Sequence, residues 1–383
     1  MTARRAAQVL LVDSSGYEDL GGASLVLDEI IDRVDRARYV PVLACLSPGR
    51  WPELVRAKGT AAYSFPRARL RSPVNLLAVV LKLCGVVRRH HIDLIHASEN
   101  SALLYASLAG RMTGTPVVWH IHSTLQANTR AEHVAAAALR RLTPKHIVFT
   151  SPATGRNSMT FAQVPTSVVF PGVDLDQCRS GDPIRGRQAF SIPPDALVLS
   201  MFARVVPVKG QADFIECLGR LLSRHPDLYG VMCGPGDRGG AYWERLEELS
   251  RHYGLGERLL MPGDVRPPLK HDVVAGSDVV LHPSRAEPFG LAVLEAMAAG
   301  KPVVAADTDG PRVMIEDGVD GVLVPPGDVE RLTAAVASLL EDPAGRAAMG
   351  AAAAVAARRF QVQDMVDGVQ AVWDEVLGPA ADR

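Results

Sequence analysis

Two carboxylates flank a predicted helix start in the stretch from Glu287 to Pro302. A buried strand is predicted to end at His282, a loop with proline and glycine follows, and a helix opens near Gly290. The free backbone amides and the dipole of such a helix start attract phosphate. Glu287 lies in the loop and Glu295 about one and a half turns into the helix, and carboxylates accept hydrogen bonds from hydroxyls. A ligand with both phosphates and hydroxyls fits both kinds of group, and a nucleotide-sugar is such a ligand.

Two cations stand on either side of a short predicted loop after the first strand of the second half. Arg204 and Lys209 lie in the sequence from Ala203 to Gly210. They could close on a diphosphate, arginine as a planar fork and lysine as a compact charge. Basic residues near strand ends are more often plain surface residues, so the pair gains weight only beside the carboxylate stretch.

A pair of histidines, His120 and His122, closes the predicted strand Pro116–His122. Alternation along a strand puts both side chains on one face. One of them could serve a ligand, or both could be structural residues with hydrogen-bonded rings. With His96 they could also form a three-histidine zinc site, although no carboxylate or fourth histidine has a clear geometric claim to complete it.

Short apolar strands alternate with helices in both halves of the chain, which is typical of a parallel sheet covered on both faces. The predicted strands are Gln8–Val12, Val40–Leu46, Asp93–His96, Pro116–His122, His146–Phe149 and Ser167–Phe170, then Ala196–Phe202, Leu228–Cys233, Arg258–Met261, Val279–His282, Pro302–Ala305 and Gly321–Val324. The predicted helices include Leu25–Val34, Ser101–Met112, Ala212–Ser223, Tyr242–Tyr253, Leu291–Ala299 and Val329–Glu341. The predicted fold class is therefore α/β, with two doubly wound halves in series.

The 383 residues suit two domains, and the charge differs between them. The formal net charge of −1 excludes a dedicated nucleic-acid binder. Residues 1–178 nevertheless carry 20 Lys+Arg and 13 Asp+Glu, which leaves 21 and 29 for the remainder. The sign changes near a linker rich in glycine and proline that begins at Pro171–Asp174. An anionic acceptor or lipid surface could therefore dock on the first half, and added salt would weaken such docking.

Nothing in the sequence predicts export or a membrane span. The five cysteines are scattered, without C-x-x-C spacing, and the N-terminus lacks the apolar core of a signal peptide, so a cytoplasmic location with reduced thiols is expected. The longest apolar stretch, Val74–Val87, is too short to span a bilayer. A core-facing helix is the default for it, and a weak peripheral contact with anionic lipid is the alternative, because arginines flank it. These are Arg67, Arg69, Arg71, Arg88 and Arg89.

The whole chain resembles the retaining glycosyltransferases of family 4, also called glycosyl transferases group 1, which have the GT-B fold. Glu287 and Glu295 match the family's Glu-x7-Glu signature, and Pro171–Asp174 resembles its Asn-Gly-Val-Asp linker with proline at the usual asparagine. Weaker matches are the glycine turns at Gly21-Gly22-Ala23, Gly234-Pro235-Gly236 and Gly263-Asp264-Val265. The resemblance implies two Rossmann-like domains facing across a cleft. An acceptor-side domain would span 1–172 and a donor domain 173–360, and a C-terminal helix of about 361–383 could pack back on the first.

The resemblance also implies roles for individual residues. His122 matches the family's active-site histidine and would position the sugar, while His120 stands where threonine is common. Arg204 and Lys209 would stabilise the leaving diphosphate, and Glu287 would hold sugar hydroxyls. The implied catalytic residues are His122, Glu287, Arg204 and Lys209. The implied donor-binding residues are Gly22, Arg204, Lys209, Gly234, Val265, Glu287, Phe289, Gly290, Leu291 and Glu295.

Two features depart from the family or compete with this interpretation. Asp174-Leu175-Asp176 and Asp307-Thr308-Asp309 spell the D-x-D that metal-dependent transferases of another fold use, but we interpret them as turn and linker residues. Because these tripeptides are interpreted as structural, no resident cofactor or metal is expected. The second feature is Val313, which stands where the family usually has glutamate after the signature helix.

The predicted function is metal-independent, retaining transfer of a sugar from a nucleotide diphosphate sugar to an acceptor hydroxyl. A UDP-sugar is favoured only because such donors are common in the resembled family. The acceptor would be a small molecule or a cell-envelope precursor. The alternatives are a catalytically silent nucleotide-sugar binding protein and a GT-B epimerase or phosphorylase.

Overall fold

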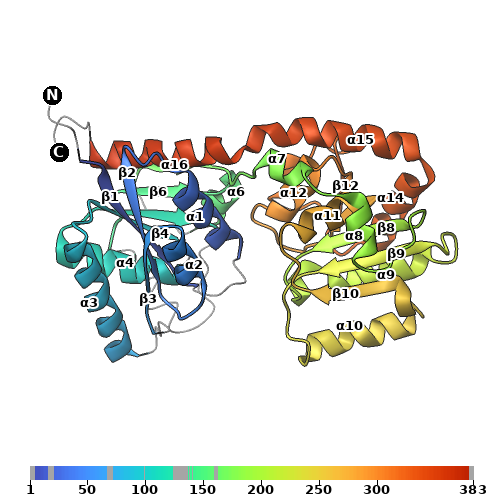
Figure 1. Cartoon of the computed structure of the whole chain (residues 1–383), viewed down its shortest axis with the longest axis horizontal. Helices are drawn as coiled ribbons and strands as arrows, with labels where there is room; N and C mark the ends of the chain where they lie inside the picture. Colours follow the sequence, from blue (N-terminus) through green and yellow to red (C-terminus); the bar gives the residue numbers. More distant parts are fainter. Residues whose placement is uncertain are drawn as a thin grey trace. The chain divides into compact units, whose positions relative to one another are not determined.

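The chain folds into two compact units in a computed structural model that describes residues 5–15, 21–66, 72–98, 100–123, 137, 139, 141–158 and 163–378. Unit 1 consists of Met1–Gly172 with Val362–Arg383, and unit 2 of Val173–Gln361. In Figure 1, unit 1 contains the blue strands and helices from the early part of the chain together with the red helix near its end.

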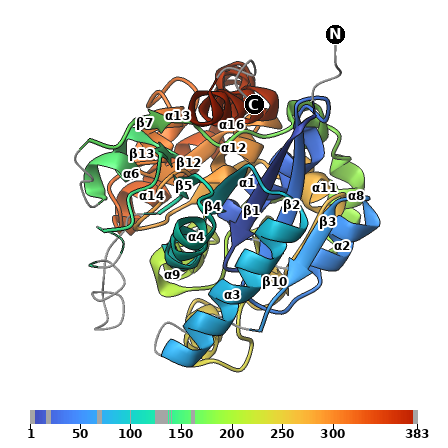
Figure 2. The same ribbon diagram turned by 90° about the vertical axis from the view of Figure 1, so that its left-hand side faces the viewer.

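The strands described in unit 1 form one parallel sheet in the order β3-β2-β1-β4-β5-β6-β7. They are β1 Ala7–Asp13, β2 Tyr39–Cys45, β3 Ala61–Ser64, β4 Leu94–Ser98, β5 Val117–Ile121, β6 His146–Phe149 and β7 Thr166–Val168. Figure 2 shows β1 between β2 and β4, where the order of the sheet reverses. This is the doubly wound arrangement expected from the sequence.

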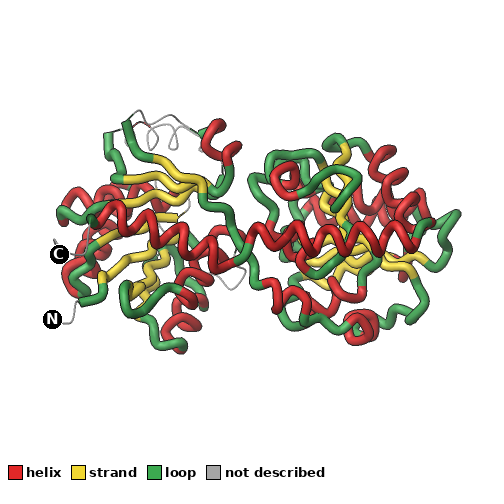
Figure 3. The backbone as a smooth tube through the Cα atoms, turned by 90° about the horizontal axis from the view of Figure 1, so that it is seen from above, coloured by secondary structure: helices red, strands yellow, loops and turns green. Residues whose placement is uncertain are grey.

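Helices cover both faces of the unit 1 sheet, as the tube in Figure 3 shows. Alternate residues of β1 give the reason, since Leu10 and Val12 belong to one apolar core and Val9 and Leu11 to another. The helices described are α1 Gly22–Arg33, α2 Trp51–Ala57, α3 Pro73–Arg89, α4 Asn100–Thr113, α6 Pro152–Asn157 and α16 Val362–Leu377. The last of these comes from the far end of the chain, and its buried face completes the second core.

Helix α3 contains the apolar stretch Val74–Val87. One side of it is buried in the core, while Val74, Leu77 and Leu81 are exposed at 80%, 55% and 49%. In the part of the chain that the structure describes, no helix is long and apolar enough to cross a membrane. Of the flanking arginines, the three in the range 67–71 lie outside the described residues. Contact of this exposed apolar stripe with anionic lipid stays a prediction.

The strands of unit 2 also form one parallel sheet, in the order β10-β9-β8-β11-β12-β13. They are β8 Leu197–Phe202, β9 Leu228–Cys233, β10 Leu259–Gly263, β11 Val279–His282, β12 Val303–Ala306 and β13 Val322–Val324. Its helices are α7 Leu175–Arg179, α8 Pro183–Gln188, α9 Gln211–Leu221, α10 Ala241–His252, α11 Leu269–Gly276, α12 Leu291–Ala298, α13 Pro311–Met314, α14 Val329–Glu341 and α15 Pro343–Ala356. Short 3₁₀ turns are η1 Pro207–Lys209, η2 Gly256–Arg258 and η3 Ala357–Phe360. The predicted α/β class with two doubly wound sheets is confirmed.

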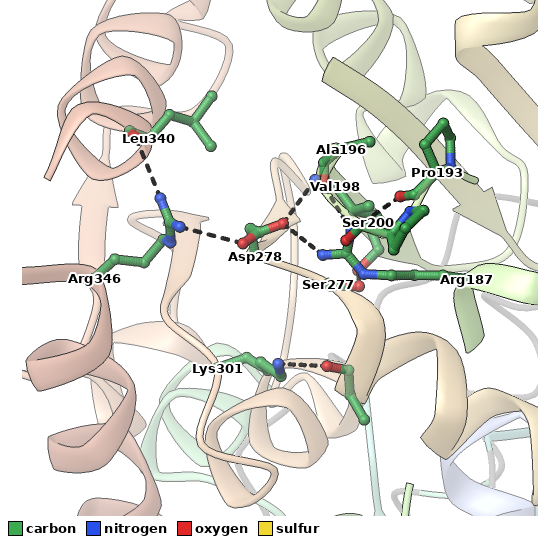
Figure 4. A network of polar contacts seen from close by, with 12 residues as sticks. Arg187, Pro193, Ala196, Val198, Ser200, Ser277, Asp278, Lys301, Leu340 and Arg346 are labelled. Atoms are coloured by element: carbon green, nitrogen blue, oxygen red, sulfur yellow. Dashed lines mark hydrogen bonds and ion pairs between the residues drawn. The ribbon is translucent and has the colours of Figure 1, made fainter. Parts of the chain in front are cut away.

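A network around Asp278 fixes the edge of this sheet where β11 begins (Figure 4). The Asp278 carboxylate accepts bonds from Arg187 at 3.1 Å and from the Val198 backbone at 2.9 Å, and it pairs with Arg346 at 3.3 Å. These partners come from α8, β8 and α15. The amino edge of the sheet therefore has a structural role, and the opposite edge, at the strand carboxyl ends, is left for binding.

The charge contrast between the halves persists in the folded units but is smaller than the sequence halves suggest. Unit 1 contains 21 Lys+Arg and 16 Asp+Glu, and unit 2 contains 20 and 26. The charge contrast between the units is smaller because residues 362–383 belong to unit 1, and most of the charged residues in this segment are acidic.

Candidate functional site

The loops that follow β8 and β11 lie at the point where the strand order of unit 2 reverses. These two strands are hydrogen-bonded neighbours. In open α/β sheets, ligands bind outside the strand carboxyl ends at such a reversal. Arg204 and Lys209 belong to the first loop and Glu287 to the second. The topology thus brings the predicted cations and the first predicted carboxylate to one place.

Glu287 is anchored by two neighbours through a single oxygen. Its Oε2 lies 2.6 Å from Lys209 Nζ and 2.8 Å from His282 Nε2. The Glu287 and Lys209 side chains are only 10% and 17% exposed. No described residue bonds to Oε1, so that oxygen is available to a hydroxyl of a ligand.

The surroundings of Glu287 keep it ionised. Burial alone would raise the pKa of this carboxyl, but the hydrogen bond and charge of His282 and the charge of Lys209 outweigh burial and lower the pKa to about 2. A carboxylate that stays charged at neutral pH accepts hydrogen bonds and cannot donate a proton as a general acid. Its chemistry fits the holding of hydroxyls.

Arg204 differs from Lys209 in having an uncompensated charge. Its side chain is exposed, and among the described residues no carboxylate pairs with its guanidinium. Its backbone is nonetheless fixed, because the Arg204 carbonyl accepts a bond of 2.8 Å from Gln211 Nε2. Lys209 and Arg285, the other cations of the two described loops at the strand reversal, are paired with Glu287 and Asp213, so the positive charge that these loops leave for an anion is that of Arg204.

Two glycines hold the site loops close together. Gly210 has φ +79°, and a Cβ added there would lie 2.3 Å from the Pro283 carbonyl oxygen. Gly234 has φ +151°, and an added Cβ would lie 1.8 Å from the Ala203 carbonyl oxygen. Backbone packing between the loops after β8, β9 and β11 thus requires glycine at both positions. A ligand contact at Gly234 stays a prediction, because packing alone explains this glycine.

Helix α12 starts at the site as expected. Gly290 caps it with φ +99°, and the first helical hydrogen bond is donated by Val293 to the Gly290 carbonyl. The amides of Leu291 and Ala292 precede that bond, which is the geometry of an anion-binding helix start.

Phe289, predicted to bind the donor, is a packing residue in the structure. Its ring is 5% exposed and makes an edge contact with Phe360, with ring centroids 5.7 Å apart. Gly310, the residue before α13, lies against the Phe289 backbone, since an added Cβ there would lie 2.0 Å from the Phe289 carbonyl oxygen. Any ligand contact of Phe289 would therefore have to come from its backbone.

Glu295 pairs with Lys270 of α11, and both side chains are 18% exposed. The ammonium of Lys270 also lies 6.0 Å from the centre of the Phe202 ring. Val265 is half-buried in the loop between β10 and α11 that leads to this lysine. The second predicted carboxylate is thus separate from the Lys209–Glu287 pair and has a cation of its own.

Unit 1 contains a row of three histidines near the carboxyl ends of β4 and β5. His96 Nε2 lies 3.2 Å from His120 Nδ1, and the His120 and His122 ring centroids are 4.1 Å apart. Burial lowers the pKa of His96 and His122 to about 3 and that of His120 well below its ordinary value, so all three rings are neutral at pH 7. His120 is 1% exposed, whereas His122 is half-buried just after β5 ends.

The zinc alternative does not fit this row. His96 Nδ1 accepts a bond of 3.1 Å from Trp373 Nε1, and its Nε2 bonds to His120, so no ring nitrogen of His96 remains for a metal ion.

Gly22, the remaining residue predicted to bind the donor, is exposed at the start of α1. Residues 16–20 before it lie outside the described part of the chain.

Comparison with known proteins decides the family. Residues 20–177 match the family model Glycosyltransferase Family 4, and residues 185–355 match Glycosyl transferases group 1. D-inositol 3-phosphate glycosyltransferase 1 of Catenulispora acidiphila is 31% identical over 311 aligned positions, and the match covers 74% of this chain and 72% of that protein. The chain is a family 4 glycosyltransferase. A D-inositol 3-phosphate glycosyltransferase of Kribbella flavida is 37% identical over 198 residues, 50% of this chain and 47% of its own length.

The fold of this glycosyltransferase is also that of solved relatives. HepE of Anabaena in complex with UDP and glucose superposes with a TM-score of 0.84 and 26% identity, over 96% of this chain and 100% of the HepE chain. The two parallel sheets with interleaved helices are thus the GT-B fold, which confirms the resemblance stated from the sequence.

Two basic residues that contact the signature glutamates were missed from the sequence. Lys270 follows a proline pair in a segment where no helix was predicted, and His282 was noted only as the end of a strand. His282 could have been found, because it lies five residues before Glu287 at the carboxyl end of a strand, where parallel sheets place ligand-binding groups. Nothing near Lys270 in the sequence points to Glu295.

The acidic tripeptides of this glycosyltransferase have structural roles. Asp174 accepts a 2.9 Å bond from the Gln177 backbone and caps α7. Asp307 pairs with Arg312 at 2.8 Å. Val313, at the family's usual glutamate, is a half-buried residue of α13.

Proposed function

We propose that this glycosyltransferase moves a sugar from a nucleotide diphosphate sugar to an acceptor hydroxyl, with retention of the anomeric configuration. The observation that carries the proposal is that the uncompensated Arg204 and the ionised, anchored Glu287 belong to the two loops at the strand reversal of unit 2. A diphosphate needs the cation, and sugar hydroxyls need the carboxylate.

A UDP-sugar is the donor we propose. HepE, at 26% identity, was crystallised with UDP-glucose as well as with UDP and glucose. Arg204, Lys209 and the amides of Leu291 and Ala292 supply positive charge for the diphosphate, so the reaction needs no divalent cation. As the bond to the diphosphate breaks, negative charge grows on the leaving group, and donors already in place stabilise it.

The two signature carboxylates, Glu287 and Glu295, bind different parts of the donor in this proposal. Glu287 accepts hydrogen bonds from sugar hydroxyls and fixes the ring, because its low pKa keeps it ionised. Glu295 holds the ribose hydroxyls. His122 of unit 1 keeps the sugar-positioning role that the family pattern implies.

The acceptor we propose is a small molecule with a free hydroxyl. The two relatives named above are D-inositol 3-phosphate glycosyltransferases, so a phosphorylated polyol is the first acceptor to assay. The excess of Lys+Arg over Asp+Glu in unit 1 favours such an anionic acceptor over a neutral one.

Incubation of the purified chain with UDP-glucose, UDP-galactose, GDP-mannose and ADP-glucose tests the proposal. A transferase is expected to release UDP slowly from one UDP-sugar without acceptor, and faster with it. Proton NMR of the glycoside then gives the anomeric configuration. An isomerised nucleotide-sugar would identify an epimerase. A shift of the melting temperature without turnover would identify a silent binding protein, and either result would contradict the proposal.

Glu295→Ala is expected to raise KM for the donor about tenfold and to change kcat little. The reason is that the variant loses one charged hydrogen bond to the ribose, and this loss weakens binding equally in the ground state and in the transition state. Lys270→Ala is the matched variant, since it frees Glu295 while keeping the carboxylate. Steady-state kinetics at saturating acceptor measure both. A fall in kcat with unchanged KM for Glu295→Ala would refute the ribose assignment.

A further inference from the structure

A buried chain of ring nitrogens leads from α16 to the end of β5 in unit 1. Trp373 Nε1 lies 3.1 Å from His96 Nδ1, and His96 Nε2 lies 3.2 Å from His120 Nδ1. The rings meet edge to face, with centroids 5.8 Å and 5.2 Å apart. Trp373 and His96 are 0% exposed and His120 is 1% exposed, so water does not compete for these bonds.

The chemistry of the first group fixes the direction of every bond in this chain. An indole N–H can only donate, so His96 Nδ1 must be an unprotonated acceptor. The proton of neutral His96 is then on Nε2, which donates to His120 Nδ1. By the same reasoning the proton of neutral His120 is on Nε2. One indole therefore sets the tautomers of two histidines.

Among the described residues, no acceptor faces the last donor of this row of rings. His120 Nε2 is buried and makes no hydrogen bond to any described residue, and the same holds for Nε2 of the adjacent His122 ring. A buried donor left without a partner costs stability, and such groups in native proteins commonly mark a ligand or an ordered water.

We propose that Trp373, acting through His96, locks His120 in the Nε2–H tautomer, and that this N–H donates to a hydroxyl oxygen of the substrate beside His122. Trp373 and His96 are positioning residues in this scheme, and His120 is a substrate-binding residue. The hydroxyl part rests on the proposed function, whereas the tautomer part stands on the unit 1 geometry alone.

Long-range ¹H–¹⁵N correlation spectra of the full chain with ¹⁵N-labelled histidine test the lock directly. Wild type is expected to show both His96 and His120 as Nε2–H tautomers at pH 7. Trp373→Phe keeps an aromatic ring but removes the donor, and it is expected to give mixed tautomers at both residues. Trp51→Phe is the matched control, because its indole is also buried and donates to Asp28 at 2.8 Å, apart from the histidines.

An Nδ1–H tautomer of His120 in wild type would overturn the lock, even if Trp373→Phe fails to fold. Unchanged tautomers in folded Trp373→Phe would overturn it as well. Because no substrate is needed, these outcomes do not depend on the proposed function.

Kinetics with the donor that the chain turns over test the hydroxyl contact. His120→Phe is expected to lower kcat/KM about tenfold, whereas His120→Gln, which retains an N–H donor at similar reach, is expected to stay within about threefold of wild type. Equal losses in the two variants would overturn the contact. If no nucleotide-sugar is turned over, the proposed function fails and with it the hydroxyl contact, while the spectra still decide the lock.

Discussion

Arg204→Ala is expected to lower kcat/KM for the donor about 10²–10³-fold, as removal of a principal transition-state stabiliser does in other enzymes. Lys209 is already paired with Glu287 at 2.6 Å, and the amides of Leu291 and Ala292 carry only partial charge. Within the two loops at the strand reversal of unit 2, both of which the structure describes, Arg204 is thus the cation without a carboxylate partner that can serve the leaving diphosphate. Steady-state rates of UDP release measure the effect.

Two variants serve as controls for the Arg204 experiment. Arg204→Lys keeps the charge but loses the planar fork, and it is expected to recover only part of the activity. Arg331→Ala removes an exposed arginine at the start of α14 and is expected to behave like wild type. If Arg204→Ala turned over the donor at nearly the wild-type rate, the leaving-group assignment would be wrong.

Glu287→Gln is expected to lower kcat about 10²-fold and to change how stability depends on pH. The folded-state pKa of about 2 lies below the ordinary value of 4.5. A depressed carboxyl pKa stabilises the fold above pH 4.5, and this contribution, about 3 kcal/mol, is lost as the pH falls from 4.5 towards 2. Glu287→Gln should lack this loss. Urea unfolding at pH 7 and at pH 3 measures it in both proteins.

Lys209→Met is the companion variant for the acid experiment, because it keeps the Glu287 carboxylate but removes the ammonium that lies 2.6 Å from its Oε2. Its loss of stability between pH 7 and pH 3 should be smaller than that of wild type, because the charge of Lys209 helps to lower the Glu287 pKa. If Glu287→Gln lost the same free energy of unfolding as wild type between pH 7 and pH 3, the anchoring of Glu287 by Lys209 and His282 would not explain its ionisation.

The sequence predicted the parts of the site that lie on regular strand-to-loop junctions. Glu287 and Lys209 are 78 residues apart, yet both follow strands of a parallel sheet, and strand order alone brings their loops together. Lys270 could not be found in this way. It lies in the first turn of a short helix after β10, two strands away from β8. Only the three-dimensional placement of α11 and α12, which both contact α7, makes it the partner of Glu295.

The other features that differ from the sequence predictions or were missed by them leave no periodic pattern in the sequence. Strand β3, Ala61–Ser64, was not predicted because four small and mixed residues carry no clear pattern. Phe289 was assigned to the donor from its place in the signature; its ring packs against Phe360, so donor binding by this residue stays a prediction for its backbone. The row that leads from Trp373 to His120 joins residues 277 and 24 positions apart, and nothing local in the sequence shows it.

Calorimetric titration of the chain with UDP tests the central claim most directly, that the strand reversal of unit 2 binds a nucleoside diphosphate through Arg204. We expect one site per chain with a Kd of about 1–100 μM, in the range of common substrate affinities, and binding at least tenfold weaker in Arg204→Ala. Absence of binding heat with UDP, GDP and ADP, or equal UDP affinity in Arg204→Ala, would contradict the account.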